Sequence, residues 1–177
     1  GALGSDPPGR ASRSRADPGR RRRRDRRGAA GVRGIDVEEG DALFNIGAFE
    51  EALESYEKAI EEDPDNEEAW NNKGNALAAL GHPDDAMRCF DKAIELNKNY
   101  YEAWYNKGLA LLKAQRFQAA IEALDKVIES KDPEFLKSPE FLAAWHAKGN
   151  ALYRMGKWDE AIKCYAEINK TRPNAAA

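Results

Sequence analysis

Long apolar runs, cysteine and histidine are scarce in this chain of 177 residues, and each scarcity excludes a class of protein. The longest apolar stretches span only a few residues, whereas a membrane-spanning helix needs roughly 20. No N-terminal segment has the apolar core of a secretory signal. Two cysteines cannot form a disulfide framework and suit the reducing cytosol, so we expect a cytoplasmic protein. Because there is no Cys/His cluster, the sequence predicts no metal site, and no cofactor is expected.

Charge is divided unevenly along the chain. Residues 1–34 contain 11 Arg, no Lys and 3 Asp, a formal charge of +8. The remainder contains 17 basic and 28 acidic residues, a formal charge of −11. Basic usage also changes, from Arg alone before residue 34 to mostly Lys after it. The chain therefore consists of two segments of different character.

Residues 1–34 are predicted to be a disordered, Arg-rich tail. Leu3 and Val32 are its only large aliphatic residues, so it cannot bury enough apolar surface to offset a chain entropy of about 1–2 kcal/mol per residue. One interpretation is a tag or linker. The other is an Arg cluster that neutralises the phosphates of a nucleic acid. The tail lacks aromatic residues for base stacking, which favours the first interpretation.

The remainder of the chain repeats at a period of 34 residues. Trp70 and Trp104 lie 34 apart, and Asn-Lys-Gly begins two residues after each. Three further series keep this period, with a final step of 41: Gly40, Gly74, Gly108 and Gly149; Ala52, Ala86, Ala120 and Ala161; and Tyr56, Phe90, Leu124 and Tyr165. Four units in one phase are therefore predicted, with seven residues inserted before the fourth.

Each unit is predicted to contain two amphipathic helices. In the second unit, Trp70, Gly74 and Leu77 recur at helical spacing. Gly81 ends this run, and Pro83 stands where a second helix can begin. A single pair of such helices cannot bury its own apolar stripe, so the units must stack on their neighbours.

These series resemble the tetratricopeptide repeat (TPR) family, whose pattern over 34 residues is W-x2-L-G-x2-Y, then A-x3-F, then P. The resemblance covers residues 35–173 and implies an all-α, right-handed superhelical solenoid of four helix-turn-helix hairpins. The units would span residues 35–66, 67–100, 101–141 and 142–173, and 174–177 would form a C-terminal tail.

The chain departs from the family pattern at several places. Lys73, Lys107 and Lys148 stand where the family has Leu before the Gly, a variant similar to archaeal and bacterial members. Asp36 replaces the Trp of the first unit, so we expect its opening helix to be frayed. The third unit lacks its closing Pro, and its match to the family pattern weakens at Val127.

In this family the first helices of successive units line a concave groove that receives an extended peptide or a partner helix. Asn side chains there suit a peptide's backbone amides, and Asn72 and Asn106 occupy one place in the repeat. The alternative is that Asn is simply common on solvated inner faces. The resemblance assigns to the groove Phe44, Asn71, Asn72, Asn75, Tyr105, Asn106, Leu109, Lys113, His146, Asn150, Tyr153 and Arg154.

One class of ligand is not expected. Family members that bind the C-terminal tails of Hsp70 and Hsp90 use a clamp of Lys, Asn and Arg side chains around two carboxylates. In either possible register, the basic places of the clamp are lost here, because they hold Val37, Asn71, Glu102, Asn106, Ala143 and Ala147. The groove instead changes from acidic near Asp41, Glu68 and Glu102 to basic at Lys113 and Arg154.

The insertion and the last unit carry two further predictions. Ser138 is expected to cap a helix that begins at Pro139, and Phe135 with Leu136 either touches a ligand or packs on the stack. Trp158, Ile162 and Tyr165 are expected to be partly uncovered, either because a helix was removed or because another molecule covers them.

The sequence therefore predicts a protein–protein interaction scaffold and not an enzyme, since neither cysteine has a histidine nearby. The alternatives are a nucleic-acid-associated adaptor that uses the Arg-rich tail, and a scaffold that self-assembles through its fourth unit. No membrane partner is expected.

Overall fold

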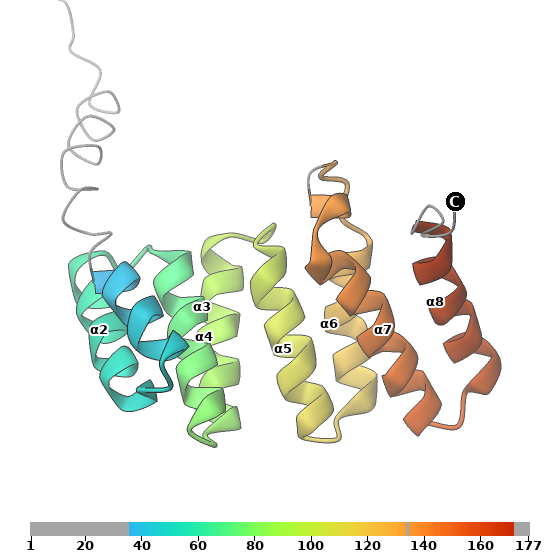
Figure 1. The fold of residues 1–177 in the computed structure, drawn as a ribbon, viewed down its shortest axis with the longest axis horizontal. Helices are drawn as coiled ribbons and strands as arrows, with labels where there is room; N and C mark the ends of the chain where they lie inside the picture. The colour runs from blue at the N-terminus through green and yellow to red at the C-terminus, as the bar shows by residue number, and fades with distance from the viewer. Residues whose placement is uncertain (1–35, 134, 172–177) are drawn as a thin grey trace, which may run out of the picture. The chain divides into compact units, whose positions relative to one another are not determined.

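The computed structural model describes residues 36–133 and 135–171, and within them the only regular elements are helices. The predicted tails, residues 1–34 and 174–177, lie outside the described residues. Residues 36–45 are helical, and the labelled elements that follow are α2 (Phe49–Glu62), α3 (Glu67–Ala79), α4 (Pro83–Leu96), α5 (Tyr101–Lys113), α6 (Phe117–Ile128), the short 3-10 helix η1 (Phe135–Lys137), α7 (Pro139–Arg154) and α8 (Trp158–Thr171) (Figure 1). The predicted all-α class is confirmed.

Local sequence signals set where several of these helices begin. The Asn66 side chain accepts a hydrogen bond from the backbone N–H of Ala69 and so caps α3. Pro83 opens α4, where its missing N–H costs nothing. Ser138 Oγ accepts from the Phe141 N–H at 3.2 Å, which confirms the predicted cap of α7.

One backbone position repeats in the turn after every first helix. Gly47, Gly81 and Gly156 adopt φ angles of 83°, 86° and 76°, in the left-handed region that glycine enters without strain. The third unit has Gln115 in this position, with φ of 58°. A side chain in that conformation costs roughly 1–2 kcal/mol, so this turn is strained.

The helices pack in a row. Each of α3 to α8 packs on the helix before it in the chain, and the row is drawn in Figure 1. The first helices also touch one another, α3 with α5 and α5 with α7. No such contact joins α2 to α4, α4 to α6 or α6 to α8 among the described residues. The first helices are therefore the inner side of a curved array, and the second helices are its outer side.

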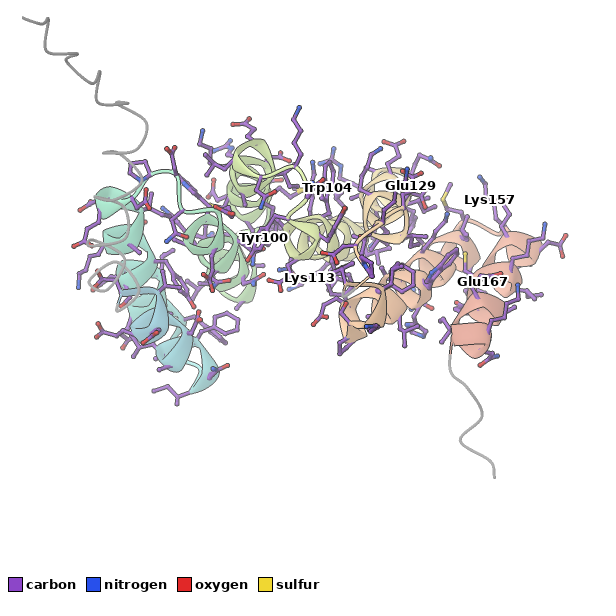
Figure 2. The ribbon with its side chains drawn as sticks, turned by 90° about the horizontal axis from the view of Figure 1, so that it is seen from above. Tyr100, Trp104, Lys113, Glu129, Lys157 and Glu167 are labelled. Atoms are coloured by element: carbon purple, nitrogen blue, oxygen red, sulfur yellow. The ribbon has the colours of Figure 1, made fainter. Side chains whose placement is uncertain are left out.

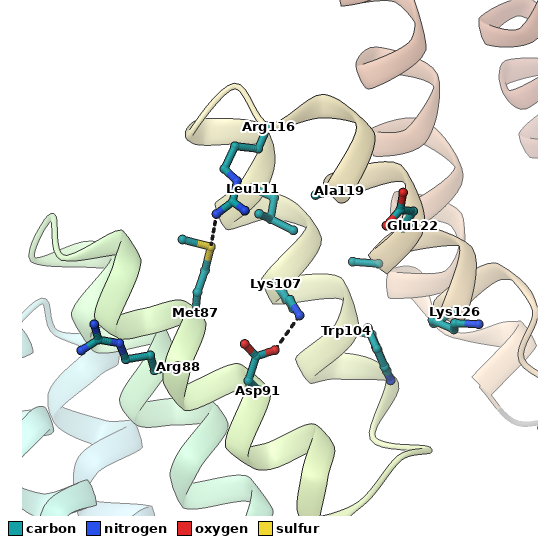
Figure 3. A pocket seen from close by; sticks show the side chains of 11 residues that line it. Met87, Arg88, Asp91, Trp104, Lys107, Leu111, Arg116, Ala119, Glu122 and Lys126 are labelled. Carbon is teal, nitrogen blue, oxygen red and sulfur yellow. Dashed lines mark hydrogen bonds and ion pairs between the residues drawn. The ribbon is translucent and has the colours of Figure 1, made fainter.

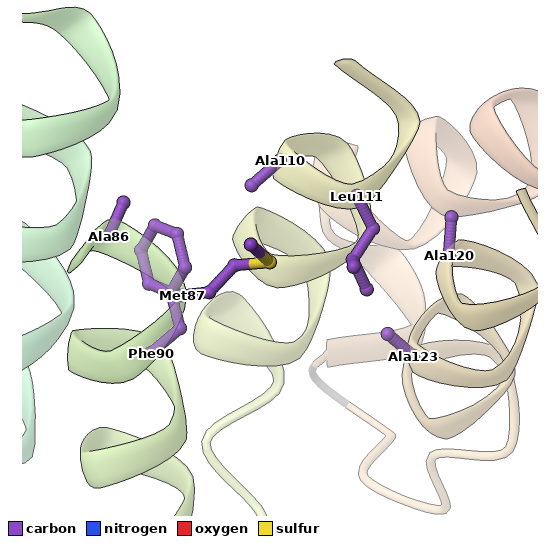
Figure 4. Close-up of a cluster of buried hydrophobic side chains, with 7 residues drawn as sticks. All are labelled: Ala86, Met87, Phe90, Ala110, Leu111, Ala120 and Ala123. Carbon is purple, nitrogen blue, oxygen red and sulfur yellow. The ribbon is translucent and has the colours of Figure 1, made fainter. Parts of the chain in front are cut away.

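Residues from three consecutive helices share the central core. Met87 and Phe90 of α4 meet Leu111 of α5 beside the small Ala120 and Ala123 of α6 (Figure 4). A stripe that one hairpin cannot bury alone is thus covered by its neighbour, as the repeat requires.

The inserted residues pack on the stack. The Phe135 ring lies 4.8 Å from that of Tyr101 on α5 and 6.5 Å from that of Phe141 on α7, centroid to centroid. Leu136 is exposed. Of the two interpretations of this segment, packing of the Phe on the stack is the one that the contacts support.

One expectation was wrong, and a second departure from the family pattern is well packed. The chain is already helical at Asp36, and the neighbouring Val37 is buried, so burial holds this helix without the Trp. Val127 is fully buried with Leu124, because α7 covers it with Ala144 and Ala147.

Candidate ligand-binding surface of the first helices

The inner side of the array is formed by the helix at residues 36–45 and by α3, α5 and α7. The outward-facing Trp104 and the basic Lys113 lie on opposite sides of α5 (Figure 2), since nine positions at 3.6 residues per turn amount to two and a half turns. We call the side that carries Lys113, together with the corresponding sides of the other first helices, the inner surface.

Four side chains on three first helices form a hydrogen-bonded chain along the inner surface, which we call the amide relay. Asn106 Nδ2 donates to Asn71 Oδ1 at 3.0 Å. Asn71 Nδ2 donates to Asn72 Oδ1 at 3.1 Å, and Asn72 Nδ2 donates to Asp41 Oδ1 at 2.9 Å. The relay therefore links the first three units through side chains alone.

The relay changes what the predicted Asn residues do. Asn71 is only 2 % exposed, so it joins two neighbouring helices and presents almost no surface to a ligand. Asn72 and Asn106 are half-buried, and each uses one of its two N–H donors within the relay. The relay therefore fixes the orientation of both amides at the surface.

A second polar group lies on the inner surface of the fourth unit. The Tyr165 hydroxyl donates to Asn150 Oδ1 at 2.8 Å, and Asn150 Nδ2 lies 3.4 Å from His146 Nδ1. The His146 and Tyr165 rings are 5.9 Å apart. His146 and Asn150 were both predicted for the groove, and the structure brings them together on an exposed stretch of α7.

Apolar side chains at the inner surface differ in how open they are. Leu109 is 38 % exposed and Tyr153 is 55 % exposed, whereas Tyr105 is half-buried among the residues that cover Leu124 and Val127. Burial, followed by the charge of Glu140, raises the pKa of Tyr105. Leu109 and Tyr153 are therefore the open apolar contacts of this surface.

The remaining predicted residues lie at its margins. Phe44 packs edge-on against Phe49 across the turn between the first two helices, with the ring centroids 5.1 Å apart. The Arg154 guanidinium lies 5.8 Å from the Phe117 ring of α6, so this side chain turns away from the inner surface. Lys113 is exposed at the end of α5, and Asn75 is half-buried on α3.

Carboxylates gather where α3 and α5 begin. A cavity of about 420 Å³ is lined by Asn66, Glu67, Glu68, Tyr100 and Glu102. Burial raises the pKa of Glu68, and the charges of Asp41, Glu102 and Glu67 raise it further. Tyr100 donates its hydroxyl to Glu102 at 3.1 Å. This end of the inner surface is therefore strongly negative, as the sequence predicted.

The three lysines that replace the family's Leu form a repeated contact between units. Lys73 Nζ lies 2.8 Å from Glu57 of α2, Lys107 Nζ lies 2.5 Å from Asp91 of α4, and Lys148 Nζ lies 2.5 Å from Asp125 of α6. Each ammonium also lies 5.5–5.8 Å from the ring centroid of the Trp three residues earlier. These carboxylates were not predicted, although Glu57, Asp91 and Asp125 follow the same 34-residue period.

A shallow depression lies on the outer side between α4 and α6, with α5 as its floor (Figure 3). Its volume is about 400 Å³, and Met87, Trp104 and Leu111 supply apolar surface. Arg116 donates to the Met87 sulfur at 3.9 Å, and the Lys107–Asp91 ion pair joins the floor of the depression to α4. Four cations, Arg88, Lys107, Arg116 and Lys126, and two carboxylates, Asp91 and Glu122, line it.

Neither thiol has the environment of a nucleophile. Cys89 and Cys164 are both free and buried. Burial raises the pKa of Cys89 to about 11 and also raises that of Cys164, despite an opposing effect of Lys73 and Lys148 respectively. Both therefore stay protonated at neutral pH.

Among residues 36–133 and 135–171, no group of three His, Cys, Asp or Glu side chains could hold a metal ion, and no helix is long and apolar enough to cross a membrane.

Three family models match successive parts of the chain. A TPR repeat model matches residues 40–81, and tetratricopeptide repeat models match residues 72–134 and 142–175. No curated protein sequence matches the chain significantly.

Solved structures with a similar arrangement of helices include MamA and PilF. A crystal structure of MamA is 28 % identical, with a TM-score of 0.70, over 78 % of this chain and 77 % of that one. MamA from Desulfovibrio magneticus RS-1 is 24 % identical, with a TM-score of 0.67, over 80 % and 76 %. PilF of Pseudomonas aeruginosa is 19 % identical, with a TM-score of 0.75, over 82 % and 63 %, and shares the fold.

Proposed function

The chain belongs to the tetratricopeptide repeat family, and we propose that it is a protein–protein interaction scaffold whose inner surface holds an extended segment of a partner protein. The amide relay is the observation that carries this proposal. It orients Asn72 and Asn106 on neighbouring helices without a ligand, so binding would lose little side-chain entropy.

The rest of the inner surface supports an extended ligand. Leu109 and Tyr153 offer open apolar contacts on α5 and α7, and Asn150 adds an oriented amide beside them. The carboxylates near Glu68 and Glu102 would favour a basic side chain at the opposite end. A segment with apolar residues toward α7 and a basic residue toward α3 fits this distribution.

Peptide selection tests the proposal. Peptides of random sequence displayed on phage are selected on the chain, and the dissociation constants of the selected peptides are measured by calorimetry. Leu109→Asp should weaken binding about tenfold or more, because it places a charge against the apolar part of the peptide. Glu122→Lys, on the outer side of α6, is the control and should bind as the wild type does. Equal binding by Leu109→Asp, or loss of binding only in Glu122→Lys, would contradict the proposal.

The adaptor alternative rests on the charge of residues 1–34, which lie outside the described residues. If the five arginines at 20–24 bind phosphates, replacing all five by Ser should abolish binding of a labelled single-stranded RNA at low salt. Unchanged binding would remove this alternative. No catalytic step is part of either proposal, because the two thiols are buried and protonated.

A further inference from the structure

The last described helix, α8, exposes an apolar face whose central position is buried in the second and third units. Ile162 is 64 % exposed, whereas Met87 and Ile121, which hold its place in units two and three, are buried under the next first helix. Trp158 is 56 % exposed, whereas its counterpart Phe117 packs with the residues of α7. The prediction that these residues of the fourth unit are uncovered is confirmed. We call Trp158, Ile162 and Ala166 the α8 face.

The first helix exposes the complementary face. Ala42 is exposed, whereas its counterparts Ala76, Ala110 and Ala151 are buried in the three following units. The same side carries the half-buried Leu43, and Ile46 in the turn that follows is 78 % exposed. We call Glu39, Ala42, Leu43 and Ile46 the N-terminal face. Both halves of the contact that joins two units are thus present on one chain, and within residues 36–133 and 135–171 neither is covered by another unit.

The charges on the two faces are reversed relative to the interior contacts. Between units, a Lys of the first helix meets a carboxylate of the preceding second helix, as Lys148 meets Asp125. The N-terminal face has Glu39 in the place of that Lys, and the α8 face has Ala166 in the place of that carboxylate. Lys163 and Lys170 flank Ala166, three positions before it and four after it on the same side of α8.

From this match we infer that the chain assembles head to tail, with the α8 face of one copy packed against the N-terminal face of a second copy. In the register of the interior contacts, Ile162 would meet Ala42 and Leu43, and Glu39 would lie between Lys163 and Lys170. Lys170, which pairs with Glu167 at 2.5 Å within its own helix, would then share its charge with Glu39. Asp159, the acidic residue on this side of α8, lies near Trp158 and away from Ala166.

The reversed charges also give the contact its specificity. A first helix of the interior type would bring a Lys to Ala166, where Lys163 and Lys170 repel it and no carboxylate receives it. The N-terminal face brings Glu39 instead. Because the two faces differ, a head-to-tail dimer still has one free α8 face and one free N-terminal face. Further copies can therefore add to form an open chain, or the two free faces can meet and close a ring.

Sedimentation velocity of the full chain tests the inference. The weight-average mass should rise with concentration, and it should rise less at high salt because the contact includes ion pairs. A mass that stays at 19.7 kDa from micromolar to millimolar concentration would overturn the inference and leave the two faces to another protein.

A mixing experiment distinguishes the head-to-tail contact from a symmetric one. Ala42→Arg blocks the N-terminal face, and Ile162→Arg blocks the α8 face; both positions are exposed, so each variant should fold, as circular dichroism would verify. Each variant alone should be monomeric, and a 1:1 mixture should form dimers and stop there. If Ile162→Arg abolishes assembly, Ala42→Arg does not, and mixing restores nothing, the α8 face pairs with itself and the inference is wrong.

A charge exchange tests the register. Glu39→Lys should weaken association about tenfold or more, because the new Lys faces Lys163 and Lys170. Ala166→Asp should do the same, because the new carboxylate faces Glu39. The double variant recreates the interior pair of Lys148 and Asp125 and should restore association. Additive loss in the double variant would contradict the proposed register. Peptide binding by the inner surface should be unchanged in all of these variants, which separates this contact from the proposed function.

Discussion

The phenolic hydroxyl of Tyr56 donates a 2.7 Å hydrogen bond to Oδ1 of Asp41, the same oxygen that ends the amide relay. Tyr56 is fully buried, and its ring fills the space beside Gly40, where a Cβ atom would lie 2.5 Å from the ring. The second helix of the first unit therefore holds the first helix by packing and holds the inner surface by a hydrogen bond. Tyr165 and Asn150 repeat the relationship in the fourth unit.

Tyr56→Phe should lower the free energy of unfolding by about 1–2 kcal/mol, because it removes a hydrogen bond to a carboxylate and leaves the packing unchanged. Tyr165→Phe is the matched control and should cost less, since Tyr165 is only half-buried and its acceptor is neutral. Urea denaturation of both variants measures the difference. An equal loss of free energy of unfolding in the two variants would show that the hydrogen bond to Asp41 stabilises the fold no more than the hydrogen bond to Asn150 does.

Trp104→Ala should lower the free energy of unfolding by about 3–5 kcal/mol, the range for removal of a large aromatic core residue. Trp104 packs against three core clusters and donates its indole N–H to the Lys98 carbonyl at 3.1 Å. Trp158→Ala, at the exposed end, should cost less than about 1 kcal/mol. Melting temperatures measure both, and a Trp104 variant that melts with the wild type would contradict the core assignment.

Gly74→Ala should destabilise the fold by about 1–2 kcal/mol. The new methyl would lie 2.5 Å from Cε1 of Phe90, a buried ring that cannot move aside, and overpacking outweighs the better helix propensity of Ala. In the third unit the methyl of Gly108→Ala would meet the branched end of Leu124 at 2.8 Å. Leu adapts more easily than a ring, so this variant should lie close to the wild type. The opposite order would refute the argument.

Gln115→Gly should stabilise the fold by about 0.5–1 kcal/mol, because it relieves the left-handed backbone that Gly47, Gly81 and Gly156 adopt without strain. Gln118→Gly, inside α6, should instead cost up to about 1 kcal/mol. Chemical denaturation should show that Gln115→Gly raises the free energy of unfolding and that Gln118→Gly lowers it, which would confirm that the backbone angle at residue 115 determines the effect of glycine there. A loss of stability in both variants would contradict the strain assigned to Gln115.

The fold could be predicted from the sequence because the 34-residue period determines which residues meet. The pairing of Gly74 with Phe90 and the cap at Ser138 depend on local spacing, and both are present. The exposure of Ile162 also followed from the period, since no further unit in the described chain covers it. Each of these features requires only the position of a residue within its unit.

The inner surface was less predictable because it depends on how side chains orient between units. Spacing places Asn71 and Asn72 on α3, but only the distance between α3 and α5 decides that Asn71 is buried against Asn106. Arg154 could reach either side of α7, and the Phe117 ring decides which. By contrast, the carboxylates that pair with the three lysines could have been predicted from the sequence, because Glu57, Asp91 and Asp125 also repeat every 34 residues.

The separation of the second helices has a mechanical consequence. Since α4 and α6 touch only through α5, the row can bend by small rotations that widen or narrow the inner surface while every helix stays intact. The relay ties the first helices of units one to three and ends before α7, where Ala147 stands in the place of Asn106. Between the third unit and the fourth, the Phe135 ring, which lies against Tyr101 of α5 and Phe141 of α7, braces the neighbouring first helices in place of the relay.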